Sequence, residues 1–247
     1  MPSGRTEVAD GVHVHAVSAL DARFLYREIF ESGTYAGVAL PEEPFVVDVG
    51  ANIGLFTLYV KQQRPRARVS AFEPLPELVA ALRANTAAFG LDGVETHEVA
   101  LGAEESEAVP FRYYPLLPSS STLYPQDQGR LKELLGRSFP PRVVERMFRG
   151  REVTVRVERL SRRLDPRRPV DLLKIDAVGA ELEILRGIDE RLRPLLRTVL
   201  VDVQDVGGRV ADLCAFLEGA GLDVSVLRPP AATGDDGLNR LIRAVRT

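Results

Sequence analysis

The stretch FVVDVGANIG, residues 45–54, decides how the rest of this chain is read. An apolar run begins at Phe45 and reaches Asp48, as is typical of a strand buried on both faces of a parallel sheet. Gly50 and Gly54 then allow a sharp turn and a close approach of the backbone to a ligand. The apolar residues 55–60 begin a helix whose N-terminus would face that ligand. The stretch therefore predicts a strand, turn and helix that bind a nucleotide.

The residues of the turn indicate which nucleotide is bound. The dinucleotide fingerprint has its middle glycine where this chain has Asn52, so a nicotinamide cofactor is the less favoured alternative. Asp48 suits a ligand that carries an ammonium and a sulfonium better than one that carries two phosphates. A second apolar strand, residues 68–72, ends in Glu73, whose carboxylate can accept hydrogen bonds from a ribose diol. Together these residues predict an S-adenosylmethionine site.

Three groups of residues resemble a known family. They are DVGANIG at 48–54, FEP at 72–74, and LKID at 173–176 followed by GAEL at 179–182. In this order they closely resemble the FkbM family of S-adenosylmethionine-dependent methyltransferases, over roughly residues 26–206. The resemblance implies an α/β class I methyltransferase (Rossmann-like) fold, with a seven-stranded sheet and a closing antiparallel hairpin. It also implies methylation of a hydroxyl on a natural product, a sugar or a lipid-linked glycan.

Two positions depart from the family pattern. Val178 stands where the family usually has an acidic residue, and Gln204 stands where it has a histidine after the later strand. Because the acceptor half departs while the cofactor half is intact, a binding scaffold that has lost turnover is one alternative function.

The cofactor residues expected from these motifs lie at the turn and at the ends of the neighbouring strands. In this fold class the residues after the third strand contact the adenine, and Tyr35 lies in a segment that resembles the family's region before the first motif. Tyr35 could cover the cofactor, or pack as an ordinary aromatic residue in a loop. The expected set is Tyr35, Asp48, Gly50, Asn52, Gly54, Glu73, Pro74, Ala100, Leu101 and Asp176.

Acidic residues at two further strand ends are the candidates for catalysis. Methyl transfer to an alcohol requires the acceptor oxygen, the methyl carbon and the sulfur in line, and removal of the alcohol's proton. We expect Asp176 or Asp202 to take that proton without a metal, and Gln204, on the same face as Asp202, to orient the hydroxyl. Asp205 is a further carboxylate at this edge, and His13, His15 and Glu28 are the next candidates. Alternatively, the carboxylates bind Mg²⁺, which lowers the pKa of a bound hydroxyl.

The chain is expected to have an N-terminal cover, residues 1–44, and a methyltransferase domain, residues 45–247, with an inserted substrate lid at 103–158. In the cover, His13 and His15 alternate with valines on a short edge strand, and a helix at 21–30 is capped by Asp21. A long insertion in a compact domain is typical of a functional segment. Interleaved acidic residues favour a solvated helix face for the lid arginines at 142, 146, 149 and 151.

Hydrophobic patterns place the remaining elements. They predict strands at 94–99, 108–114, 152–157, 171–176, 198–203, 222–227 and 241–245, and helices at 76–89, 179–186 and 210–218. A turn at 234–237 separates the last two strands. His97 is expected to be a packed or surface residue of its strand, and Cys214 a buried helix residue that cannot form an intramolecular disulfide.

The amino-acid composition limits the classes of function that the chain can have. The 247 residues are 45% hydrophobic and 27% charged, as in an ordinary soluble globular protein. The formal net charge of −3 gives no general attraction to nucleic acid or anionic lipid. Neither a membrane span nor a signal peptide is indicated, which predicts a cytoplasmic enzyme acting on a small molecule.

Overall fold

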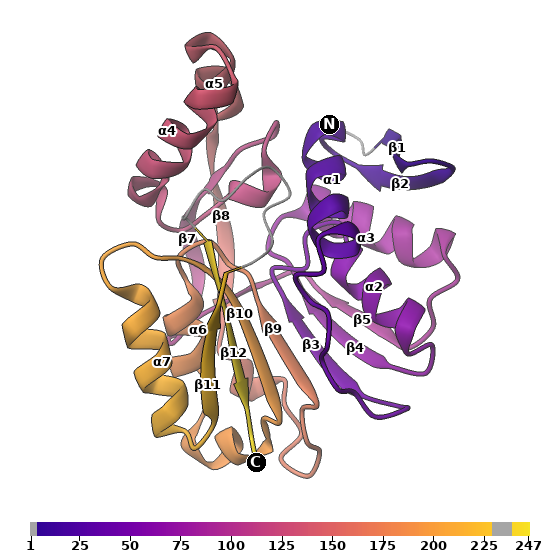
Figure 1. Cartoon of the computed structure of the whole chain (residues 1–247), viewed down its shortest axis with the longest axis vertical. Coiled ribbons are helices and arrows are strands. Elements are labelled where there is room, and N and C mark those ends of the chain that lie inside the picture. Colours follow the sequence, from indigo (N-terminus) through magenta and orange to yellow (C-terminus); the bar gives the residue numbers. More distant parts are fainter. Residues whose placement is uncertain (1–3, 229–238) are drawn as a thin grey trace.

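The computed structural model describes residues 4–228 and 239–247, and within them a sheet of seven strands forms the centre of the molecule (Figure 1). The spatial order is β11-β12-β10-β9-β3-β4-β5. All neighbours from β5 to β10 pair in parallel, whereas β12 pairs antiparallel with both β10 and β11. This is the class I methyltransferase sheet with its closing hairpin, as predicted. Its strands are β3 (Phe45–Val49), β4 (Arg68–Phe72), β5 (Val94–His97), β9 (Leu172–Ile175), β10 (Thr198–Gln204), β11 (Asp223–Leu227) and β12 (Asn239–Val245).

The central strands are continuous apolar runs because helices cover both faces of the sheet. Val46 packs in a core with α1 (Ala19–Tyr26), α2 (Leu55–Gln63) and α3 (Pro76–Ala88). Its neighbour Val47 points the other way, into a core with α6 (Glu181–Arg186) and α7 (Arg209–Gly219). Cys214 of α7 is half-buried rather than buried as predicted, because the buried face of the helix carries Leu213 and Leu217.

The N-terminal segment differs from the expected edge strand. It forms a separate hairpin of β1 (Gly4–Ala9) and β2 (Val12–Ala16), which pair with each other. Asn85 of α3 holds this hairpin, since its side chain accepts from the His15 amide at 2.6 Å and donates to the His15 carbonyl at 3.0 Å. Hydrogen bonding to the helix α3 therefore replaces pairing with the main sheet.

The first helix begins earlier than predicted, because its cap is Ser18 and not Asp21. The Ser18 hydroxyl oxygen accepts from the Asp21 amide at 3.4 Å, and α1 continues into the π-helical segment η1 (Arg27–Glu31). The Asp21 carboxylate instead accepts from the amide of Ser119 at 3.0 Å and from its hydroxyl at 2.6 Å. Asp21 therefore joins α1 to the inserted segment.

The inserted segment is built on a second sheet of three strands, in the order β6-β8-β7. The predicted strand at 94–99 ends at His97, and the following β6 (Ala100–Leu101) pairs with β8 (Arg151–Glu158) instead of continuing along β4. The strands β7 (Ser106–Tyr113) and β8 rise from the main sheet toward two helices, α4 (Gly129–Ser138) and α5 (Pro141–Met147) (Figure 1). The short helices η2 (Pro118–Ser120) and η3 (Pro125–Gln128) connect β7 to α4. A small core of Tyr114, Val144, Met147 and Phe148 lies beneath α5.

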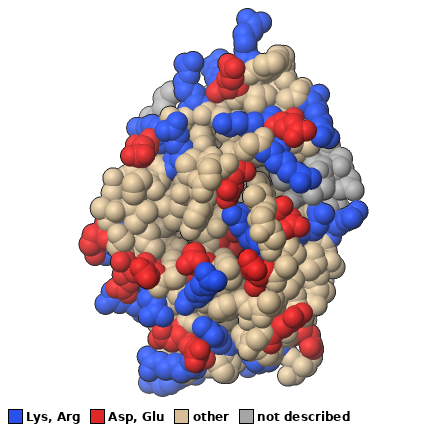
Figure 2. Space-filling view, turned by 90° about the vertical axis from the view of Figure 1, so that its left-hand side faces the viewer, with Lys and Arg blue, Asp and Glu red and all other residues tan. Residues whose placement is uncertain are grey.

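The outer face of this insertion is basic and solvated. Figure 2 shows Lys and Arg side chains gathered at the top of the molecule, where α4 and α5 lie. The arginines at 142, 146, 149 and 151 are all exposed. The predicted solvated helix face is correct for Arg142 and Arg146 of α5, whereas Arg149 follows the helix and Arg151 begins β8, where it donates to Glu77 of α3 at 2.5 Å.

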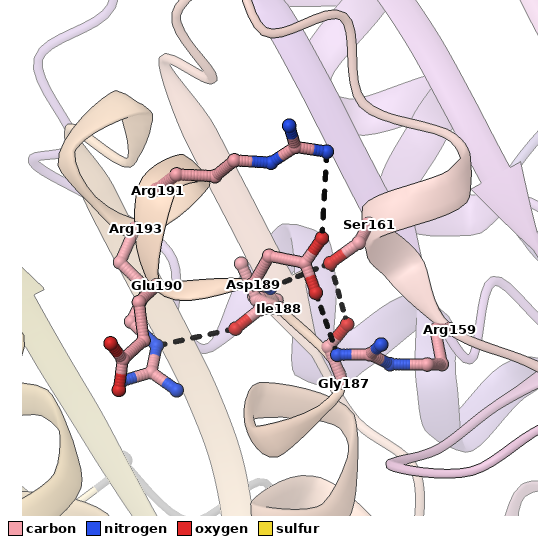
Figure 3. A network of polar contacts seen from close by, with 8 residues as sticks. All are labelled: Arg159, Ser161, Gly187, Ile188, Asp189, Glu190, Arg191 and Arg193. Atoms are coloured by element: carbon pink, nitrogen blue, oxygen red, sulfur yellow. Dashed lines mark hydrogen bonds and ion pairs between the residues drawn. The ribbon is translucent and has the colours of Figure 1, made fainter.

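A polar network joins the segment after β8 to the segment after α6 (Figure 3). The Asp189 carboxylate accepts from Arg159 at 2.7 Å, and the Asp189 amide donates to the Ser161 hydroxyl oxygen at 2.6 Å. That hydroxyl donates in turn to the Gly187 carbonyl at 2.8 Å. The segments contain η4 (Leu160–Arg162) and η5 (Glu190–Leu195). The network therefore fixes the inserted sheet to the main domain.

Two further sequence predictions concern the C-terminal half. Helix α6 begins at Glu181 rather than at Gly179, whose φ of +110° is not helical. The predicted turn at 234–237 lies outside the described residues. Within the parts of the chain that are described, none of the helices has the length and apolar character needed to cross a bilayer.

Candidate active site

The first pocket lies at the carboxyl ends of β3, β4 and β9. It brings together seven of the residues predicted to bind the cofactor. They are Gly50, Asn52, Glu73, Pro74, Ala100, Leu101 and Asp176.

Gly50 allows the turn after β3 to lie directly against the end of β9. Its φ is +71°, and a Cβ at this position would lie 1.8 Å from the carbonyl oxygen of Asp176. The amides of Gly50 and Ala51 both donate to the Phe72 carbonyl at 3.0 Å, which fixes the turn to β4 as well. A side chain at residue 50 would therefore displace the backbone that forms the pocket.

Glu73 has the geometry expected of a ribose acceptor. Its side chain is only 5% exposed, and its two carboxylate oxygens accept from the amides of Asn52 and Leu75, each at 3.0 Å. Burial raises its pKa to about 7, although these two hydrogen bonds and Lys174 act in the opposite direction. Each oxygen keeps a further lone pair for a ligand hydroxyl, so the residues present fit an adenosine-containing cofactor.

Asp48 lies behind the pocket wall and does not line it. Its carboxylate accepts from the Thr57 hydroxyl at 2.8 Å and lies 3.3 Å from the ammonium of Lys174. The Lys174 ammonium also lies 3.7 Å from the Asp176 carboxylate and donates to the Gly50 carbonyl at 3.2 Å. Burial lowers the pKa of Lys174, but Asp48 and Asp176 outweigh it and the net shift is upward. Lys174 was missed as a site residue, although a lysine in the apolar run 172–175 is a signal for a buried ion pair.

Two other predicted cofactor residues lie outside the first pocket. Tyr35 packs edge-on against Phe56 with ring centroids 4.9 Å apart, beside a separate cavity of about 270 Å³. Tyr35 is therefore packed as an ordinary aromatic residue, which is one of the two alternatives that the sequence left open. Gly54 is the N-terminal cap of α2, with a φ of +86°.

A second pocket, of about 920 Å³, lies beside the first. Both are lined by Asp176, and also by Leu25, Ser119 and Val178. Its lining includes the polar side chains of Glu28, Asp176, Glu181, Asp202, Gln204 and Asn239, and the apolar side chains of Phe24, Leu117, Leu131, Leu134 and Leu135. Asp202 and Gln204 therefore belong to the second pocket, and Asp176 lies on the border between the two.

The two strand-end carboxylates differ in their surroundings. Burial raises the pKa of Asp202 well above its usual value, and the charges of Asp176 and Glu28 raise it further. Burial also raises the pKa of Asp176, but the adjacent Lys174 ammonium opposes this shift. Asp176 is therefore the one of the pair that ionises more readily.

The comparison with protein families identifies the chain. The Methyltransferase FkbM domain matches residues 48–223. The chain belongs to the FkbM family of S-adenosylmethionine-dependent methyltransferases. The chain is 38% identical over 229 residues to the methyltransferase sdnD of Sordaria araneosa, with 88% of each chain covered. It is 34% identical over 241 residues to the 31-O-demethyl-FK506 methyltransferase FkbM of Streptomyces tacrolimicus, with 92% of each covered.

Solved structures support the fold. A methyltransferase FkbM from Methylobacillus flagellatus aligns with a TM-score of 0.55 at 14% identity, covering 89% of this chain and 47% of that one. A precorrin-6y C5,15-methyltransferase from Geobacter metallireducens aligns with a TM-score of 0.51 at 14% identity, covering 87% and 86%.

In this FkbM methyltransferase, Val178 has a strained backbone at the border of the pockets. Its φ of +45° lies in the left-handed region, which is rare for a β-branched residue and costs about 1–3 kcal/mol. The Thr122 hydroxyl donates to the Val178 carbonyl at 2.6 Å, and so holds the inserted segment against this residue. The sequence carried no signal for this contact, because 56 positions separate the two residues.

Among the remaining candidates for catalysis, Glu28 lines the second pocket. The others do not line either pocket. His13 and His15 belong to the N-terminal hairpin, and His97 stacks on Phe72 at 4.5 Å, the packed position predicted for it. Asp205 is exposed. Across residues 4–228 and 239–247, no three His, Cys, Asp or Glu side chains are grouped so that they could hold a metal ion.

Proposed function

We propose that this protein is an O-methyltransferase that acts on a hydroxyl of a small natural product or sugar-containing metabolite. The observation that carries the proposal is the position of Asp176, which lines both the cofactor pocket and the pocket beside it. The name of one relative, 31-O-demethyl-FK506 methyltransferase, supports the choice of oxygen as the methylated atom.

The first pocket holds the cofactor. S-adenosylmethionine, when bound, supplies an electrophilic methyl group on a sulfonium. Glu73 would offer carboxylate oxygens to the ribose hydroxyls, and Ala100 and Leu101, which line the same pocket, would lie beside the adenine. The turn at Gly50 and Asn52 would hold the remaining part of the cofactor, and Lys174 keeps that turn in place through the Gly50 carbonyl.

The second pocket holds the acceptor, and its carboxylates remove the acceptor's proton. When the acceptor oxygen takes the methyl group, the methyl–sulfur bond would break and S-adenosylhomocysteine would leave. The hydroxyl proton would pass to a carboxylate, for which Asp176 is the first candidate. Lys174, 3.7 Å from Asp176, favours the ionised form that this step requires. Asp202 is the second candidate, and Gln204 is placed in the same pocket to orient the hydroxyl.

The proposal is tested by locating the transferred methyl group. The protein is incubated with methyl-labelled S-adenosylmethionine and hydroxyl-bearing metabolites, with EDTA present, and the products are analysed by mass spectrometry and NMR. A labelled methoxy group is the expected result. A label on nitrogen or carbon, or activity that requires added Mg²⁺, would contradict it.

A further inference from the structure

The floor of the second pocket carries buried oxygen atoms that have no hydrogen-bond donor. They are Asp202 Oδ2, Glu181 Oε2 and Asn239 Oδ1. Asp202 is 7% exposed and Glu181 is 1% exposed. Arg209 Nε lies 4.0 Å from Glu181 Oε2, an ion pair that is beyond hydrogen-bonding distance. Because a buried acceptor without a donor costs free energy, these oxygens indicate a ligand that supplies donors.

Apolar side chains of α4 also line the same pocket. Leu131, Leu134 and Leu135 lie on one face of this helix, at the spacing that places side chains together. Phe24 of α1 is a further apolar lining residue and is 41% exposed. A pocket that combines apolar side chains with a cluster of acceptors suits a ligand with a hydrocarbon body and one polar end.

The charges around the floor favour a cationic polar end. Among the described residues that line the second pocket, four are acidic and none is Lys or Arg. The nearby Lys174 lies against Asp48 and Asp176, and the Arg209 guanidinium donates to Asp127 at 2.6 Å. The lining side chains therefore favour a cationic over an anionic polar end.

We propose that the methyl acceptor is an amphipathic amino alcohol, whose protonated primary amine is held by Asp202 and Glu181 and whose hydrocarbon body lies against α4. An ammonium has three donors and no acceptor, which matches the oxygens left without donors on the floor. This inference rests on the proposed function, because it names the class of molecule that enters the acceptor pocket. Asp202 and Glu181 are then the residues that select the acceptor.

Ionisation of Asp202 distinguishes this arrangement from simple apolar binding. Burial and the charges of Asp176, Glu28 and Glu181 raise the pKa of the Asp202 carboxyl. The Lys174 ammonium lowers it. An ammonium beside this carboxyl favours its charged form, so binding of an amine releases a proton from Asp202. An uncharged alcohol of the same length has no such effect.

The test uses octylamine, 1-octanol and octanoate as probes, each titrated calorimetrically into the full chain saturated with S-adenosylhomocysteine. Octylamine is expected to bind about tenfold or more tightly than 1-octanol, and octanoate most weakly. Titration in buffers with different ionisation enthalpies is expected to show proton release with octylamine alone. Equal binding of amine and alcohol, or binding of octylamine only when S-adenosylhomocysteine is absent, would overturn the proposal.

Single substitutions test whether Asp202 causes the preference for octylamine and the proton release. Asp202→Asn is expected to weaken octylamine about tenfold and to abolish proton release, with 1-octanol unaffected. Asp205→Asn makes the same change at an exposed position outside the pocket and should leave all three probes unchanged. Leu134→Ser should weaken amine and alcohol alike. An unchanged ratio of amine to alcohol affinity in Asp202→Asn would overturn the assignment.

The binding test is separate from the test of methyl transfer. If a hydroxyl compound without an amine is methylated efficiently while octylamine shows no preference, the proposed function stands and the amine proposal is overturned. If octylamine binds as expected but no oxygen is methylated by any amino alcohol tested, the proposed function fails instead.

Discussion

Glu73→Gln removes a carboxyl whose pKa burial raises from 4.5 to about 7. A carboxyl with a raised folded pKa contributes stability that is complete below its unfolded pKa and is lost as the pH rises through its folded pKa. A shift from about 4.5 to about 7 corresponds to about 3.4 kcal/mol, of which about 2.5 kcal/mol is lost between about pH 5 and pH 8. The wild type should therefore lose about 2.5 kcal/mol more of its free energy of unfolding than Glu73→Gln over this range.

Urea unfolding of both proteins at the two pH values measures this difference. Glu107→Gln makes the same substitution at an exposed position and should follow the wild type. Comparing pH dependences, rather than single stabilities, separates the ionisation of Glu73 from the hydrogen bond with Asn52 or Leu75 that the glutamine weakens. Equal pH dependence in wild type and Glu73→Gln would refute the reasoning.

The same residue should make cofactor binding depend on pH. An ionised carboxylate has acceptors at both oxygens, so bound ribose hydroxyls favour the charged form. Affinity of the wild type for S-adenosylhomocysteine should fall by up to about tenfold for each pH unit below about 7. Calorimetric titration of Glu73→Gln should show weaker binding that no longer changes with pH. A pH-independent wild type would remove Glu73 from the cofactor site.

Three further substitutions test the geometry of the pockets. Gly50→Ala places a Cβ 1.8 Å from the Asp176 carbonyl and should destabilise the fold by about 1–3 kcal/mol or more, measured by urea unfolding; wild-type stability would contradict the close approach. Burial raises the pKa of the Asp202 carboxyl, so the wild type should lose free energy of unfolding relative to Asp202→Asn as the pH rises from acid to neutral. A variant that becomes less stable relative to the wild type over this range would contradict the direction of that pKa shift. Thr122→Val leaves the Val178 carbonyl without its donor, should cost about 1–3 kcal/mol, and should speed proteolysis between residues 103 and 158; an unchanged cleavage rate would show that this bond does not hold the insertion.

The cofactor side of the site could be predicted from sequence because its signals are local. The strand, the turn at Gly50 and the acid at Glu73 occur within 29 consecutive positions, and parallel pairing of β3 with β4 brings them together. The direction of each side chain was harder to predict. Asp48 and Lys174 pair across neighbouring strands behind the pocket wall. An acid expected at the ligand therefore holds a lysine that belongs to the LKID motif but was not expected among the site residues.

The acceptor side depends on contacts between distant parts of the chain. The local sequence predicts that Asp21 caps a helix, but Ser18 caps it instead. The Asp21 carboxylate accepts a hydrogen bond from Ser119, which is 98 positions away. Ala100 and Leu101 were predicted to follow the strand at 94–99, but they form a strand of their own that pairs with β8 after the long insertion. The second pocket combines η1, α4 and the ends of β9 and β10, which no single stretch of sequence reveals.

The central claim is that Asp176, at the border of the two pockets, receives the acceptor's proton without a metal. It is tested most directly by single-turnover transfer from labelled S-adenosylmethionine to a hydroxyl acceptor in EDTA, for wild type and Asp176→Asn. The account predicts a labelled methoxy product from the wild type, a rate about 10²–10⁴-fold lower in Asp176→Asn, and little change in affinity for S-adenosylhomocysteine. A normal rate in Asp176→Asn, or a wild-type activity that EDTA abolishes and Mg²⁺ restores, would contradict it.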